Sequence, residues 1–145
     1  EIKAVSNFLA SKGVWHQIEG NLICTKRRSI KIPEVNEKVA YFTGAITGDG
    51  AITTCKRKVG GYLYRIQIVG YRKYLTCLIP MLNYLFNYKP NILKDKRKKN
   101  CYLINIYSAA IFAYFIKLGL TAGKKRNLTV PRIIANNPVL FKHYM

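Results

Sequence analysis

An aspartate bracketed by two glycines at the end of an apolar stretch is the feature of this chain that most directly suggests chemistry. Residues 42–50 read FTGAITGDG, which places Asp49 between Gly48 and Gly50. The chain has only six acidic residues against 25 lysines and arginines, giving a net charge of +19. A carboxylate is a hard oxygen ligand that suits Mg²⁺, and so large a positive charge favours a polyanionic partner. The combination predicts a divalent cation held beside a nucleic acid.

Length and composition restrict the other function classes. The chain has 145 residues, half of them apolar, enough for one domain with a buried core. The longest apolar run, Tyr107 to Ile116, is too short to cross a membrane. Four scattered cysteines and two histidines, without a C-x-x-C pair, disfavour a zinc site. We expect reduced cysteines, an intracellular location and no membrane partner.

The first 36 residues are predicted to form an appendage. A helix is expected at 2–10, followed by a hairpin of strands 14–18 and 21–26 that turns at Glu19-Gly20. A basic, strand-like segment, 26–32, then leads to the rest of the chain. A helix followed by a two-stranded wing is compatible with a small winged DNA-binding unit, and a structural cap is the alternative.

From 37 to 127 the pattern alternates helices with hairpins, with Asn36 as the N-cap of the first helix. That helix, 39–46, has no polar stripe, so it is predicted to be buried on all sides. The later elements are strands 51–59 and 62–69, a helix at 74–86, strands 92–96 and 102–106, and a helix at 109–118. This order predicts an α+β fold, a four-stranded antiparallel sheet with helices on one face and the other face left for a ligand.

This αββαββα order and the sequence of residues 42–50 resemble the LAGLIDADG homing endonucleases. Four positions match the motif: Gly44, Ile46, Asp49 and Gly50. Gly48 stands where the family accepts Ala or Gly, whereas Thr47 replaces the first acid of the motif, a position that varies in the family. The resemblance implies that Asp49 binds the catalytic metal, Mg²⁺ or Mn²⁺, with Gly48 beside it in the metal site. It implies a site-specific DNA endonuclease that hydrolyses phosphodiester bonds.

Gly44 and Gly48 lie four residues apart, hence on one face of the helix, which lets a second helix approach until the backbones touch. One motif supplies one acid, and a double-strand break needs two. Either two copies pair through this face, or the chain is the N-terminal half of a two-motif protein. The second scheme is favoured by residues 128–145, which look like a linker and the lead-in to a second motif helix.

In the family the open face of the sheet lies in the major groove, so the resemblance implies contacts to double-stranded DNA. Strand alternation places Arg65 and Gln67 on one face, opposite Ile66. Arg pairs well with guanine and Gln with adenine, so these two are the predicted base contacts. The other predicted contacts are polar or basic residues of the two hairpins, with phosphate contacts expected in the second hairpin: Thr53, Lys56, Arg57, Lys58, Lys94, Lys96, Arg97, Lys98 and Lys99.

Family members also place basic or polar groups near the metal. Arg72 and Lys73, just after the second strand, are the nearest candidates by order, and a purely structural role at the start of a helix is the alternative. Two other functions stay open. A basic sheet would also suit intron RNA, as in a maturase that assists splicing. The loss of the first motif acid at Thr47 allows a non-catalytic DNA-binding regulator.

Overall fold

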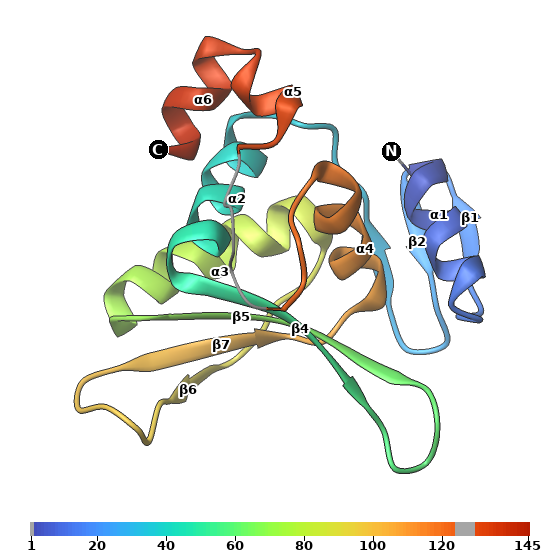
Figure 1. Cartoon of the computed structure of the whole chain (residues 1–145), viewed down its shortest axis with the longest axis horizontal. Coiled ribbons are helices and arrows are strands. Elements are labelled where there is room, and N and C mark those ends of the chain that lie inside the picture. Colours follow the sequence, from blue (N-terminus) through green and yellow to red (C-terminus); the bar gives the residue numbers. More distant parts are fainter. Residues whose placement is uncertain (1, 124–129) are drawn as a thin grey trace.

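The computed structural model describes residues 2–123 and 130–145, and its helices lie on one face of a four-stranded sheet (Figure 1). The helices are α1 (Ile2–Ser11), α2 (Glu37–Asp49), α3 (Arg72–Phe86), α4 (Ala109–Leu118), α5 (Arg132–Ala135) and α6 (Pro138–Tyr144). The strands are β1 (Gln17–Glu19), β2 (Leu22–Cys24), β3 (Ser29–Lys31), β4 (Gly50–Lys56), β5 (Tyr62–Gly70), β6 (Ile92–Lys94) and β7 (Tyr102–Ile106). Of the helices described, none has the length and apolar character needed to cross a membrane.

The main sheet has the strand order β4-β5-β7-β6, with every neighbouring pair antiparallel. The predicted α+β class and the αββαββα order are therefore confirmed. Strand β4 ends at Lys56 rather than at Val59, because the chain turns earlier than expected. The amide of Arg57 already donates to the carbonyl of Gly61, and both glycines of the turn, Gly60 and Gly61, have positive φ.

The N-terminal segment forms a second, smaller sheet with the order β1-β2-β3. The hairpin predicted here is present, and the basic segment after it adds a third strand. Helix α1 packs against α4, and the Phe8 ring lies 6.3 Å from the ring of Tyr64 and 6.0 Å from that of Phe112, centroid to centroid. The N-terminal residues therefore share one apolar cluster with the main sheet.

Helix α2 begins as predicted, since the side-chain oxygen of Asn36 accepts a hydrogen bond of 2.9 Å from the Val39 amide. The prediction that this helix is buried on all sides is wrong. Tyr41 is 41% exposed, and Gly48 and Asp49 are exposed as well. The reason is that α2 packs against the sheet on one side and against α6 on another, which leaves a third side uncovered by the described residues.

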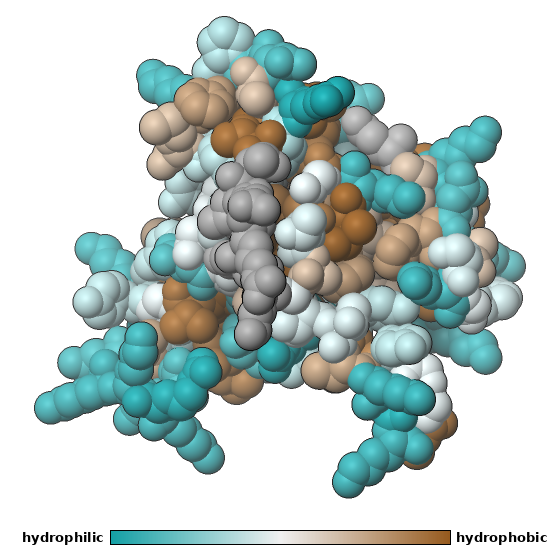
Figure 2. Space-filling model, in the orientation of Figure 1, coloured by the Kyte–Doolittle hydropathy of each residue, from teal (hydrophilic) through white to brown (hydrophobic). Residues whose placement is uncertain are grey.

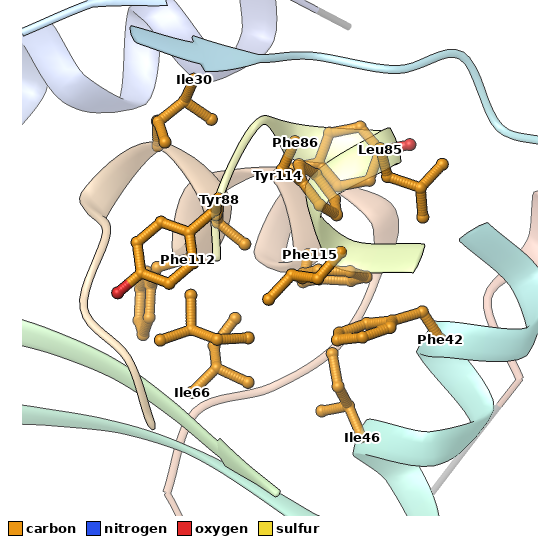
Figure 3. Packing of buried hydrophobic residues seen from close by; sticks show 14 of the residues in the cluster. Ile30, Phe42, Ile46, Ile66, Leu85, Phe86, Tyr88, Phe112, Tyr114 and Phe115 are labelled. Atoms are coloured by element: carbon orange, nitrogen blue, oxygen red, sulfur yellow. The ribbon is translucent and has the colours of Figure 1, made fainter. Parts of the chain in front are cut away.

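An aromatic cluster joins α2, α3 and α4 above the sheet. Figure 3 shows Phe42 and Phe115 facing one another, with Ile66 of the sheet nearby. The Phe115 ring lies 6.0 Å from that of Phe42 and 5.6 Å from that of Phe86, and all three side chains are fully buried. Because these contacts link three helices at one ring, we expect Phe115 to contribute strongly to folding.

Replacing Phe115 with Ala should lower the free energy of unfolding by about 3–5 kcal/mol, since the lost apolar burial is compounded by a cavity. Urea denaturation followed by circular dichroism measures the change. Phe141→Ala is the matched control, because the Phe141 side chain on α6 is 36% exposed. Equal losses in the two variants would show that the cluster does not carry the fold.

Candidate metal centre and nucleic-acid interface

Asp49 is the last residue of α2, and the next residue already belongs to strand β4. Gly50 closes the helix, because its amide donates to the carbonyl of Ile46, and it also pairs with Ile68 of β5. A Cβ at Gly50 would lie 2.9 Å from the backbone oxygens of Gln67 and Ile46. Only glycine lets the end of the helix rest so closely on the sheet. The exposed carboxylate of Asp49 is thereby fixed at the junction of α2 and the sheet.

Tyr74 of α3 is an electrostatic neighbour of Asp49. Partial burial raises the pKa of Tyr74 above its ordinary value, and the charges of Asp49 and Tyr41 raise it further. A Cβ added at Gly70, the end of β5, would lie 2.9 Å from the Tyr74 ring, so this ring packs over that strand end. Sequence reasoning missed Tyr74, although it follows the two basic candidates directly.

The two predicted helpers, Arg72 and Lys73, are exposed at the start of α3. The guanidinium carbon of Arg72 lies 5.9 Å from the ring centroid of Tyr102 on β7. The contact places Arg72 beside the sheet, and the role of both residues near a metal stays a prediction.

The described residues contain no group of three or more His, Cys, Asp or Glu side chains that could hold a metal ion. Asp49 nevertheless fits a site for Mg²⁺, which commonly uses one or two carboxylates and completes its octahedron with water and phosphate oxygens. Gly48, predicted to belong to the same site, is exposed at the end of the helix.

Gly44, predicted to lie in a helix pair, is covered by α6. A Cβ built there would overlap the backbone carbonyl oxygen of Tyr144 and lie 2.9 Å from its carbonyl carbon. A smaller apolar cluster of Ala40, Ile134 and Leu140 continues this packing. At Gly48, one turn later, a Cβ would meet no described atom within 4 Å. The close approach is therefore made by the chain's own C-terminal helix at Gly44.

The open face of the sheet carries a patch of hydrogen-bonded polar side chains from three strands. Gln67 donates from Nε2 to Oδ1 of Asn105 at 2.9 Å, and Arg65 donates from Nε to Oγ1 of Thr53 at 3.3 Å. All four residues alternate with buried isoleucines such as Ile66, which confirms the predicted facing of Arg65 and Gln67. Asn105 was missed, and the same period-two rule applied to residues 104–106 would have found it.

Both hairpin ends are exposed and basic. Figure 2 shows hydrophilic side chains gathered on two arms, with a hollow between them. The β4–β5 arm carries Lys56, Arg57 and Lys58, and the β6–β7 arm carries Lys94, Lys96, Arg97, Lys98 and Lys99, all of them exposed. These positions suit contacts to a bound polyanion on either side of the polar patch.

Arg97 also has a structural task that the sequence did not reveal. Its Nε and Nη2 donate to the two carboxylate oxygens of Asp95 at 3.1 and 3.2 Å, and its backbone amide donates to the same carboxylate. The side chain of Asp95 is only 4% exposed. Arg97 therefore stabilises the conformation of the β6–β7 arm, and its guanidinium is hydrogen-bonded to Asp95 without any bound phosphate.

These geometric features define a class of protein. The motif predicted two features that the structure has. Helices cover one face of a four-stranded antiparallel sheet, and Asp49 lies where α2 meets the edge strand β4. The resemblance to the LAGLIDADG homing endonucleases is confirmed at the level of the fold. No protein-family model matches the sequence, and no curated protein is a detectable relative.

The solved structures that match this chain include several of I-DmoI. A variant in complex with its nicked target DNA in the presence of manganese has 23% identity and a TM-score of 0.53, covering 74% of this chain and 56% of the other. I-DmoI in complex with DNA and calcium has 22% identity and a TM-score of 0.50, covering 74% and 53%. Mesophilic variants of the homing endonuclease I-DmoI match with 25% identity and a TM-score of 0.49, over 57% and 45%. The chain spans about half the length of these structures.

Gly44→Ala should lower the free energy of unfolding by about 1–3 kcal/mol, because the added methyl group forces α6 away from α2. Gly48→Ala is the control on the same helix face, and it should raise the free energy of unfolding by about 0.5–1 kcal/mol through helix propensity alone. Urea denaturation measures both. Equal changes in the two variants would contradict the close approach at Gly44.

The Asp95–Arg97 pair predicts an acid-dependent loosening of the β6–β7 arm. Hydrogen bonds from Arg97, with a smaller effect of Lys98, lower the pKa of Asp95 below its ordinary value of 3.8. A lowered pKa in the folded state stabilises the arm above pH 3.8, and this contribution is lost as the pH falls through the folded pKa. The protection factor of the Arg97 amide, the exchange rate of an unprotected amide at the same pH divided by its own, should therefore fall only below pH 3.8. In Asp95→Asn the protection factor should already be lowered at pH 6, and an unchanged protection factor in that variant would contradict the account.

Proposed function

We propose that this chain is one half of a divalent-metal-dependent endonuclease that cuts double-stranded DNA. The observation that carries the proposal is the position of Asp49, an exposed acid at the meeting point of α2 and a sheet whose open face is polar and whose arms are basic. A net charge of +19 favours a polyanionic substrate. The I-DmoI structures with target DNA, and with manganese or calcium, support the same substrate and metal class.

Each group has a defined task in this proposal. The two arms hold the duplex through its phosphates, and Arg65, Gln67 and Asn105 face the base edges in the major groove. The carboxylate of Asp49 supplies an oxygen ligand to the metal. When bound, a divalent cation such as Mg²⁺ or Mn²⁺ polarises the scissile phosphate and lowers the pKa of a coordinated water. Cutting both strands requires a second acid, from another copy or from a further motif outside this chain.

A non-catalytic DNA-binding regulator on the same fold is the second candidate, and one observation favours it. Thr47 stands where the motif has its first acid, and its hydroxyl donates to the carbonyl of Thr43 at 2.9 Å within the helix. That side chain supplies no carboxylate to a metal. The regulator would bind duplex DNA through the same sheet and arms without cutting it.

Asp49→Asn separates the two functions. In the presence of Mg²⁺ or Mn²⁺, the parent protein should cut members of a plasmid library with randomised inserts. The variant should cut about 10³-fold more slowly, since a metal contributes several kcal/mol to the transition state. Duplex affinity should be unchanged, because the replaced group does not contact the bases.

Glu37→Gln is the matched control, because Glu37 is an exposed acid at the other end of the same helix. It should cut as the parent does. Equal cutting by the parent and by Asp49→Asn would overturn the metal role of Asp49. Tight duplex binding by a parent that cuts nothing with either metal would support the regulator instead.

A further inference from the structure

The turn between β2 and β3 carries three consecutive cations, Lys26, Arg27 and Arg28, and all three side chains are exposed. The turn is closed by its own hydrogen bonds. The amide of Thr25 donates to the carbonyl of Arg28 at 2.8 Å, and the Thr25 hydroxyl donates to the same oxygen at 3.2 Å. Lys26 and Arg27 therefore stand at the tip of a short, defined turn rather than in an open loop.

This turn is anchored to the main core. The guanidinium carbon of Arg28 lies 4.5 Å from the ring centroid of Tyr88, a residue that is only 6% exposed. One residue beyond the turn, the Ser29 carbonyl accepts a hydrogen bond of 3.1 Å from Nδ2 of Asn87. A cation resting on a buried ring, together with this hydrogen bond, fixes where the tip lies relative to α3 and the sheet.

Tyr88 also connects the turn to the end of the open sheet face. Its hydroxyl oxygen accepts a hydrogen bond of 3.1 Å from the backbone amide of Tyr107. Tyr107 directly follows β7, two positions after Asn105, and it is 43% exposed. One tyrosine side chain therefore bridges the cationic turn and the end of the strand that carries part of the polar patch.

The cations of the turn take part in none of the ion pairs of the described residues, which join Arg97 to Asp95 and His143 to Glu37. Adjacent like charges repel one another, so an anion bound at the tip would relieve a cost that the folded chain otherwise carries.

We propose that the β2–β3 turn is an additional contact for duplex DNA, outside the main sheet. Lys26 and Arg27 bind backbone phosphates beyond the end of the sheet, and Arg28 is a positioning residue that holds the tip through Tyr88. The inference rests on the proposed function, since the ligand is the same duplex. Phosphates of a duplex, rather than the bases of a single strand, are the expected ligand, because the turn offers no exposed ring on which a base could stack.

The test is the salt dependence of binding to a 30-base-pair duplex of random sequence, measured by fluorescence anisotropy. Each phosphate neutralised adds about 0.9 to the slope of log affinity against log salt. The double variant K26A/R27A should therefore lower the slope by about 1.8 relative to the parent. K3A/K12A removes the same charge from the same N-terminal segment, with Lys3 in α1 and Lys12 directly after it, and it should leave the slope unchanged.

A third variant, K56A/K58A on the β4–β5 arm, distinguishes failure of this inference from failure of the proposed function. If K56A/K58A lowers the slope and K26A/R27A does not, the turn makes no duplex contact and the inference is overturned. If K26A/R27A and K3A/K12A lower the slope equally, the effect is one of net charge, and the inference is again overturned. A parent that binds no duplex overturns the proposed function as well. If K26A/R27A weakens binding to an RNA hairpin but not to the duplex, the turn contacts RNA and the inference is overturned.

Discussion

The contact on which the structure depends is the approach of the end of α2 to strand β5 at Gly50. With a side chain at this position, the helix would have to move away from the backbone of Gln67. The helix would then end at a different point over the sheet, and Asp49 would be displaced with it. Phe42 and Ile46 fasten the same helix to the core from the other side (Figure 3). The carboxylate of Asp49 is therefore positioned by the backbone contact at Gly50 and by the apolar packing of Ile46 and Phe42, one and two turns earlier.

The distribution of charge around Asp49 indicates what its carboxylate could bind. The hairpin ends and the β2–β3 turn are strongly basic, whereas the polar patch between the arms is built from amides, a hydroxyl and one guanidinium. Cations at the edge suit phosphates, and amides in the middle suit base edges. An acid is costly beside a polyanion unless a cation lies between them, which is the physical reason for linking Asp49 to a metal.

The sequence predicted the elements well and the details of packing poorly. Alternation of Arg65 and Gln67 with isoleucines was enough to assign the faces of β5, and the same rule could have found Asn105. Helix α2 lacked a polar stripe, yet Tyr41 is exposed, because periodicity cannot tell how many neighbours a helix has. The Asp95–Arg97 pair was missed, since a buried acid in a run of lysines looks like any surface charge. Contacts such as Arg28 on Tyr88 join residues 60 positions apart, and no local pattern predicts them.

Paramagnetic relaxation by Mn²⁺ tests the central claim, that Asp49 presents a metal to a bound duplex, most directly. With a random-sequence duplex present, small additions of Mn²⁺ should selectively broaden the backbone amide signals of Gly50 and Tyr74, while those of Gly20 in the β1–β2 turn and Gly60 at the β4–β5 hairpin tip stay sharp. The Asp49→Asn variant should lose this selective broadening. Broadening centred on another acid such as Glu19, or unchanged in the variant, would contradict the account.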